Sequence, residues 1–290
     1  MPAEVERLLI ALFADIHGNL PALEAVLKEA RALKPDLMLS LGDQVNLGPA
    51  SEDVLSLLRA ENVRCLHGNH ERYILECMDG QRAYDAVNFA PVRFLASRVE
   101  RSAVTFPMTA EFGGITFCHA LPNDDRFPLH GVQALKRLEA VANTLPERVI
   151  CGHSHDMRRH TVFGHSVECI GSLGCQDQGV PGTALWGTIR ISGKNSSLIP
   201  RVSAYDPSPL KNLYVKSGLS RAAPVMSRVC LSQLLQNRAV ILPFLRFCES
   251  IALERGEQGI TPAAFAEADK RFPWGDGLTT NDFWKQEVFL

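Results

Sequence analysis

Five short apolar segments of the chain are each followed within a few residues by side chains that can bind a metal ion. The segments cover residues 8–14, 36–41, 63–66, 115–118 and 148–151. Each has the length and aliphatic content of a buried strand. The polar residues that follow them are, in chain order, Asp15 and His17, Asp43, Asn69 and His70, His119, and His153 and His155. Because ligands in open α/β sheets bind outside the carboxyl ends of the strands, we expect these side chains to converge on one edge of the sheet.

Helical patterns lie between the first three segments. Residues 20–33 repeat apolar residues at helical spacing after Asn19, which can cap a helix. Residues 51–60 do the same, with Ser51 as a capping residue and acids in the first turn. The alternation of strands and helices predicts an α/β fold with a parallel sheet. Further along, residues 131–144 predict a helix and residues 158–204 predict a β-meander.

Composition excludes several classes of protein. The formal net charge is −2. So small a net charge indicates neither a specific nucleic-acid partner nor binding to a membrane surface. The first apolar run is short and follows acidic residues, unlike a signal peptide or a membrane span. The eight cysteines are scattered and form no CxxC pair, which predicts reduced, structural thiols in a cytoplasmic protein.

The ligand types restrict the metal. A mixture of imidazole, carboxylate and amide oxygen suits Mn²⁺, Fe, Ni²⁺ or Zn²⁺ and is too rich in nitrogen for a pure Mg²⁺ or Ca²⁺ site. Seven ligands are too many for one tetrahedral zinc site, so we expect two divalent transition metals that share a carboxylate. We expect the other histidines to be surface, hydrogen-bonded or supporting residues; these are His67, His130, His160 and His165.

In these motifs the sequence resembles the calcineurin-like metallophosphoesterase family. Its DxH, GD, GNH(D/E), isolated histidine and GHxH motifs correspond to residues 15–17, 42–43, 68–71, 118–119 and 152–155. Residues 47–49 and 171–174 (GSLG) also resemble its small bacterial phosphodiesterase-like branch. The resemblance covers roughly residues 8–206. It implies a mixed two-sheet β-sandwich flanked by helices, with residues 1–206 as the metallophosphoesterase domain.

The resemblance also implies a role for each motif residue. Asp15, His17 and His155 would hold the first metal, whereas Asn69, His119 and His153 would hold the second. Asp43 would bridge the two metals. A metal-bridging hydroxide would attack a phosphodiester or phosphomonoester in line. His70 would stabilise the developing charge or protonate the leaving oxygen.

The second motif departs from the GDxVDRG pattern of the protein-phosphatase and bis-nucleoside tetraphosphatase branches. Asn46 replaces the aspartate that orients the catalytic histidine; it can accept a hydrogen bond but lends no charge to His70. Leu47 replaces the arginine that grips phosphate, which leucine cannot do. Arg126, in the loop after His119, is the first candidate for the missing substrate-binding cation, ahead of Arg72 and Arg158.

Two classes of function therefore compete. The first is a metal-dependent phosphoesterase acting on a small phosphate ester, with protein phosphatase and bis-nucleoside tetraphosphatase as narrower alternatives. The second is a non-catalytic binding scaffold, a role that some proteins of this fold have. All seven ligands and His70 are present, which favours the enzyme. The substrate itself cannot be read from one sequence.

Residues 207–290 lie almost entirely outside the resemblance. Their apolar residues at helical spacing predict a helical extension packed on the first domain. An alternative is that its helices, or its aromatic tail, form a homodimer contact or overhang the metal site. That tail contains Trp274, Phe283, Trp284 and Phe289.

Overall fold

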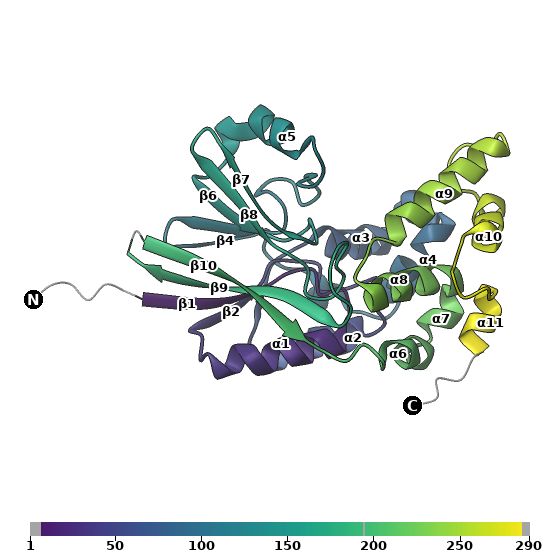
Figure 1. Cartoon of the computed structure of the whole chain (residues 1–290), viewed down its shortest axis with the longest axis horizontal. Helices are drawn as coiled ribbons and strands as arrows, with labels where there is room; N and C mark the ends of the chain where they lie inside the picture. Colours follow the sequence, from purple (N-terminus) through teal and green to yellow (C-terminus); the bar gives the residue numbers. More distant parts are fainter. Residues whose placement is uncertain (1–6, 194, 286–290) are drawn as a thin grey trace, which may run out of the picture.

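Two five-stranded mixed sheets face each other at the centre of the computed structural model, which describes residues 7–193 and 195–285 (Figure 1). The first sheet has the order β10-β9-β1-β2-β3 and the second β4-β5-β6-β8-β7. The first sheet contains β1 (Arg7–Phe13), β2 (Leu37–Ser40), β3 (Arg64–Cys65), β9 (Thr183–Ser192) and β10 (Asn195–Ala204). The second contains β4 (Thr109–Phe112), β5 (Ile115–Cys118), β6 (Arg148–Cys151), β7 (Met157–Val162) and β8 (His165–Ile170). The predicted two-sheet fold is therefore confirmed.

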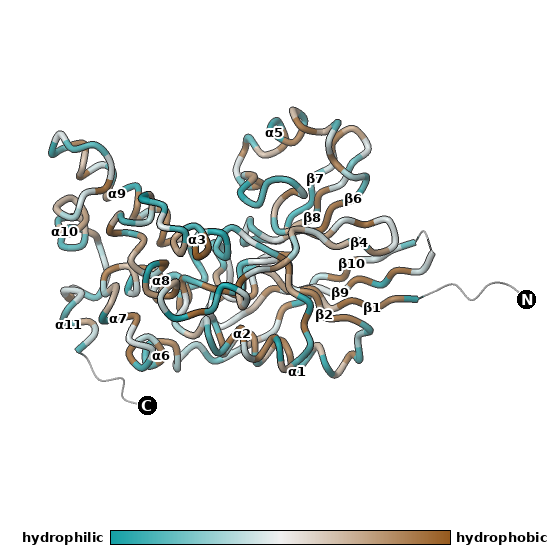
Figure 2. Tube along the Cα trace, turned by 180° about the vertical axis from the view of Figure 1, so that it is seen from behind, coloured by the Kyte–Doolittle hydropathy of each residue, from teal (hydrophilic) through white to brown (hydrophobic). Residues whose placement is uncertain are grey.

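Strand β1 shows why its run of apolar residues is continuous. Ile10 and Leu12 belong to the core between the two sheets, whereas Ala11 and Phe13 pack against the helices on the outer face. All four side chains are fully buried, as expected of a strand whose two faces are both covered. β1 is parallel to β2, and β2 to β3, so their carboxyl ends share one edge. Figure 2 shows hydrophobic residues along the strands of the sandwich.

The helices of the first two thirds of the chain cover the outer faces of the sandwich and the edge where the parallel strands end. They are α1 (Leu20–Ala32), α2 (Ser51–Ala60), α3 (Asn69–Met78), α4 (Ala90–Ala96) and α5 (Ala134–Val141), with 3-10 turns at Arg82–Asp85, Val87–Phe89, Arg101–Val104 and Ala142–Thr144. The Asn19 side chain accepts from the Ala22 N–H, so the predicted cap of α1 is confirmed. The predicted cap of α2 is wrong, because the Ser51 hydroxyl accepts from the Asn46 N–H instead.

The predicted β-meander over residues 158–204 is also wrong. These residues form two antiparallel hairpins that belong to different sheets: β7 pairs with β8, and β9 with β10. Gly164 and Gly193 lie in the two turns with positive φ, as expected for tight corners. The segment between the hairpins crosses from one sheet to the other and contains the GSLG sequence.

Residues 207–285 form the helices at the end of the molecule opposite the start of β1 (Figure 1). They are α6 (Leu210–Ser217), α7 (Leu219–Ala222), α8 (Pro224–Gln236), α9 (Ile241–Glu254), α10 (Pro262–Arg271) and α11 (Thr280–Lys285). Their shared core also contacts Leu47, Val87, Ala90 and Phe94 of the preceding part. Among the described helices, none is both long and apolar enough to cross a membrane.

The described part of the aromatic tail packs on α8. The Arg228 guanidinium lies 4.1 Å from the Trp274 ring centre and 4.9 Å from that of Phe283, and it is 1% exposed. The Trp284 indole N–H donates to the Pro224 carbonyl at 3.0 Å. These aromatic residues thus contact other residues of the same chain. They are not among the residues that line the pocket formed beside the predicted metal ligands Asp43, Asn69 and His153. Phe289 lies outside the described residues.

Candidate metal centre

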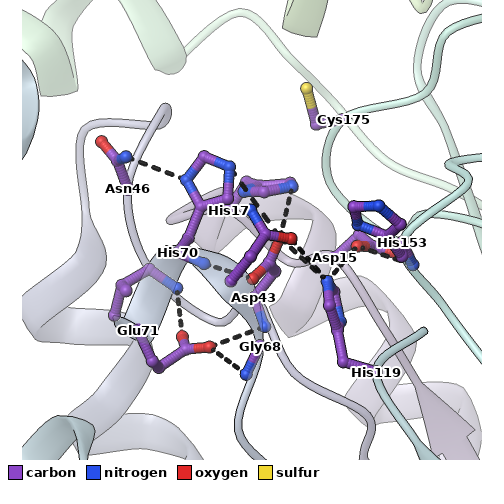
Figure 3. A network of polar contacts seen from close by, with 12 residues as sticks. Asp15, His17, Asp43, Asn46, Gly68, His70, Glu71, His119, His153 and Cys175 are labelled. Carbon is purple, nitrogen blue, oxygen red and sulfur yellow. Dashed lines mark hydrogen bonds and ion pairs between the residues drawn. The ribbon is translucent and has the colours of Figure 1, made fainter. Parts of the chain in front are cut away.

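The predicted ligands come from five loops, and the structure brings them together (Figure 3). The expectation of a single sheet is wrong, because the loops after β1, β2 and β3 belong to the first sheet and those after β5 and β6 to the second. Asp15, His17, Asp43, Asn69 and His119 are buried. His70, His153 and His155 are partly exposed, so the cluster is open on their side. Three overlapping groups have potential ligand atoms within 4.8 Å of one another: Asp15–His17–His155, Asp15–Asp43–His119 and His17–Asp43–His70.

His17 and His155 face each other through their Nε2 atoms, which are 3.1 Å apart. His155 Nε2 also lies 3.7 Å from Asp15 Oδ1. At most one proton can lie between two imidazole nitrogens, and the buried Nδ1 atoms of both rings lack a hydrogen-bond partner. A cation shared by the two Nε2 atoms and the Asp15 carboxylate would satisfy all three groups.

His119 and Asn69 form a second such pair. His119 Nδ1 lies 3.0 Å from the Leu41 carbonyl, to which a ring N–H at that position donates. In the neutral ring this contact leaves Nε2 as a lone-pair acceptor, and Nε2 lies 3.0 Å from Asn69 Oδ1, another acceptor. Two acceptors at this distance repel each other unless a proton or a cation lies between them. The donor set therefore fits a metal ion.

Asp43 lies between these two pairs. Its Oδ2 atom is 3.7 Å from His17 Nε2 and 3.3 Å from His119 Nε2. Burial would raise the pKa of Asp43, but the charges of His119 and His70 outweigh it and hold this pKa well below its ordinary value. Asp43 is thus an anion placed between the two candidate sites.

Burial acts differently on the neighbouring groups. It raises the pKa of Asp15 to about 6, against the opposing charges of His155 and His119. Burial lowers the pKa of His153 to about 3, with repulsion from His119 as the next cause. Burial also lowers the pKa of His119, but Asp43 reverses the shift and raises it to about 9. Without a metal, the protonation state thus differs from one group of the cluster to the next. Bound cations would instead favour the anionic form of the carboxylates and the neutral form of the imidazoles together.

The backbone at the site is strained. Eleven described residues other than glycine have positive φ, and seven of them are in this site. They are Asp15, His17, Asp43, Asn46, Leu47, His153 and His155. The left-handed region costs a residue with a side chain free energy, and such residues persist where the surroundings impose them, commonly at functional sites. The strain marks these loops as functional independently of their residue types.

The loops that impose this conformation are hydrogen-bonded to one another. The His17 N–H donates to the Asp43 carbonyl, and the Gly48 N–H to the His17 carbonyl. The GSLG loop braces Asp15 from the other side, because the Ser172 hydroxyl donates to the Asp15 carbonyl at 2.8 Å. Gly68 has extended backbone, and a Cβ there would lie 2.3 Å from Asp43 Oδ1, so this glycine permits close approach and does not form a turn.

Glu71 holds the Asp43 loop in place, although the motif alone assigned it no role. Its buried carboxylate accepts from the N–H groups of Asp43, Gln44 and Gly68 at 2.9 Å each, and of Val45 at 3.3 Å (Figure 3). It stands three residues after Gly68, the residue before α3, where an acidic residue can complete a capping box. That spacing is the sequence signal that could have identified it.

We expect Glu71→Gln to lower the free energy of unfolding by about 2–4 kcal/mol, because a carboxamide nitrogen leaves buried N–H groups without an acceptor at about 1–3 kcal/mol each. Urea denaturation measures the change. Glu24→Gln makes the same substitution at an exposed position of α1 and should change stability by less than about 0.5 kcal/mol. Equal effects of the two substitutions would contradict the bracing role of Glu71.

His70 and Asn46 lie in direct contact. Asn46 Nδ2 is 2.9 Å from His70 Nδ1, so the amide donates and the ring accepts, whereas we expected Asn46 to accept. The ring proton is therefore on Nε2, which lies 3.9 Å from Asp43 Oδ2. Burial lowers the pKa of His70 to about 4, so the ring is neutral near pH 7. This arrangement presents an N–H donor beside the candidate metal ligands.

The predicted substrate-binding residue Arg126 does not itself line the pocket but lies beside a residue that does, and its role stays a prediction. Arg126 is exposed and its guanidinium lies 5.9 Å from the ring centre of Tyr73, which does line the pocket. Arg72 forms a double hydrogen bond with Asp125 at 2.7 and 2.8 Å, and Arg158 is paired with Asp156. Among the described residues that line the pocket, none is lysine or arginine.

The remaining four histidines lie in different environments. His160 and His165 contact backbone carbonyls at 3.1 Å, so the expectation of hydrogen-bonded residues is confirmed for them. His67 is buried, and burial lowers its pKa. His130 is exposed but lines the pocket, a position that no sequence pattern predicts.

Asp177 and Gln233 also lie at the site without any sequence signal. Asp177 Oδ1 is 3.6 Å from His155 Nδ1 and accepts from Gln233 Nε2 at 2.8 Å. The Gln233 side chain is buried and comes from α8, far along the sequence from the metal motifs. The chain thus uses its last helices to hold the loop beside His155.

Similarity to known proteins agrees with this geometry. Serine/threonine-protein phosphatase 2 of Escherichia coli is 38% identical over 71 residues, which are 24% of this chain and 33% of that protein. The uncharacterized protein MJ0912 of Methanocaldococcus jannaschii is 35% identical over 81 residues, which are 27% of this chain and 33% of that protein. The chain thus spans about a third of the length of these curated relatives.

Two crystal structures share the fold. A metallophosphoesterase from Sphaerobacter thermophilus has a TM-score of 0.59 at 19% identity, covering 79% of this chain and 99% of that one. Hypothetical protein PH1004 from Pyrococcus horikoshii has a TM-score of 0.61 at 17% identity, covering 80% and 99%. The family model for calcineurin-like phosphoesterases matches residues 8–157 of the sequence, just over half of the 290-residue chain. The chain therefore belongs to the calcineurin-like phosphoesterase family.

Proposed function

We propose that the chain hydrolyses small phosphate esters with two divalent transition metals, Mn, Fe, Ni or Zn. Asp15, His17 and His155 would hold one metal, and Asn69, His119 and His153 the other, with Asp43 shared. The observation that carries the proposal is the contact of His119 Nε2 with Asn69 Oδ1 at 3.0 Å, with the Asp43 carboxylate 3.3 Å from the same nitrogen. A metal cation would satisfy this set of facing acceptors. When bound, the metals supply Lewis-acid polarisation of phosphoryl oxygen and a more acidic water.

The chain's own residues would contribute a hydrogen-bond donor and a fixed arrangement of the ligand side chains. The neutral His70 ring would donate its Nε2–H to a phosphoryl or leaving oxygen, and Asn46 would hold the ring in that tautomer through the 2.9 Å contact with Nδ1. The strained loops bearing Asp15, Asp43 and His153 fix their side chains before substrate arrives, so little reorganisation is needed.

The narrower alternatives are less well supported. Leu47 lines the pocket where the protein-phosphatase and tetraphosphatase pattern has an arginine, and no lysine or arginine is among the described lining residues. The scaffold alternative must account for strain at five of the seven ligand-bearing positions, which binding by another surface would not require. The eight cysteines are free, which fits the reducing cytoplasm. A homodimer stays a prediction.

The test is hydrolysis of bis(4-nitrophenyl) phosphate by the purified chain with added Mn²⁺. We expect activity that a chelator removes and that Mn²⁺ restores. Asp43→Asn, purified in the same way, controls for contaminating phosphatases. Absence of hydrolysis of this diester, of 4-nitrophenyl phosphate, of a phosphopeptide and of a dinucleotide tetraphosphate with each of the four metals would support the scaffold instead.

A further inference from the structure

The pocket next to the metal ligands has two unlike sides. Its volume is about 370 Å³, which suits a small organic molecule. One side carries the histidines and carboxylates described above. The other is apolar, with Phe89 and Val92 from the region of α4 and Met226, Ile241, Leu242 and Leu245 from α8 and α9. The C-terminal helices thus supply much of the surface that a substrate would meet beyond the metals.

The apolar side is held in a fixed position relative to the metal ligands. The Gln233 side-chain oxygen accepts from the N–H groups of Val240 and Ile241 at 2.9 and 3.0 Å, where α9 begins. Its amide nitrogen donates to Asp177, whose carboxylate lies 3.6 Å from His155 Nδ1. One buried side chain therefore ties the first turn of α9 to the loop beside a predicted ligand, so the pocket is formed before substrate binds.

The charges of the pocket restrict the phosphate. Its described lining includes the carboxylates of Asp43 and Asp177 and neither lysine nor arginine. Bound metals would offset the charge of a phosphodiester, which is a monoanion. Among these lining residues there is no lysine or arginine to offset the further charges of a polyphosphate chain or of a fully ionised monoester.

We infer that the site takes phosphodiesters in which one alcohol group is apolar and lies against the α8–α9 side of the pocket. This inference rests on the proposed function and narrows it to a substrate class. Burial of the apolar group supplies binding that the pocket cannot obtain from cationic side chains.

The experiment uses the full chain with Mn²⁺ and alkyl 4-nitrophenyl phosphate diesters from methyl to hexyl. We expect kcat/KM to rise roughly two- to fourfold for each methylene that enters the pocket. Leu242→Ala should flatten this dependence. Leu253→Ala is the matched control, because Leu242 is 48% and Leu253 77% exposed on the same helix and only Leu242 lines the pocket.

Calorimetry gives a second readout that needs no turnover. Methyl alkyl phosphates, which hydrolyse slowly because both leaving groups are alkoxides, titrated into the Mn²⁺-loaded protein should show a heat-capacity change on binding that becomes more negative with alkyl length, in the wild type and in Leu253→Ala more than in Leu242→Ala. Hydrolysis that is independent of chain length, or faster for 4-nitrophenyl phosphate than for every diester, would overturn the inference and leave the proposed function standing. Absence of hydrolysis of all these esters would overturn both.

Discussion

Asp43→Asn should lower kcat/KM for a phosphodiester by roughly 10³-fold or more, since metal-ion stabilisation is worth several kcal/mol and about 1.36 kcal/mol is tenfold. The substitution keeps the side-chain volume, and its amide oxygen can still accept from the backbone N–H of His70, as Asp43 Oδ1 does at 2.8 Å. What it removes is the anion between His17 and His119. Metal content should fall from two ions per chain to one or fewer, measured on the same sample as the activity.

A matched control separates this effect from a general loss of acidic charge. Asp53→Asn makes the same change on an exposed residue of α2 and should alter neither activity nor metal content. Far-ultraviolet circular dichroism checks that both variants are folded. If Asp43→Asn retained two metals and at least a tenth of the wild-type rate, Asp43 would not bridge, and the assignment of a shared carboxylate would have to be abandoned.

Convergence of the first three metal motifs could be predicted because it depends on sheet geometry alone, but the expectation that all five motifs meet at one edge of one sheet is wrong, since β5 and β6 belong to the second sheet. Parallel strands that follow one another through helices must end on the same edge, so a polar residue after each strand must join the others there. The loops after β1, β2 and β3 illustrate this rule. The fold class followed from the same alternation together with the family resemblance.

Other features depend on contacts that local pattern does not encode. Alternating residues identify β7 to β10 as strands but do not say which sheet each hairpin joins, so two hairpins were predicted as one meander. Ser51 has the residue type of a cap, yet tertiary contact draws its hydroxyl to Asn46. The approach of Gln233 to the loop beside His155 joins segments 56 residues apart and leaves no sequence signal.

The second prediction separates a metal ligand from a catalytic donor at neighbouring positions. We expect His119→Ala to lose the second metal and nearly all activity, because His119 Nε2 faces both Asn69 and Asp43. We expect His70→Ala to keep two metals but to slow turnover by roughly 10²–10⁴-fold, the usual contribution of a general acid or base. Inductively coupled plasma mass spectrometry and kcat, measured on the same preparations, give the two numbers for each variant.

The metal content of His70→Ala tests whether His70 is itself a ligand, because a ring nitrogen of His70 lies within 4.8 Å of potential ligand atoms of His17 and Asp43. If His70→Ala lost metal to the same extent as His119→Ala, His70 would be a ligand. Asn46→Ala then adds a third comparison. It removes the amide that contacts His70 Nδ1, so it should slow turnover by less than His70→Ala and leave metal content unchanged. If His70 is a donor held in one tautomer by Asn46, this order of effects is expected. If His70 is a metal ligand, metal content should fall in both His70→Ala and Asn46→Ala, because residues that orient a ligand also affect metal affinity.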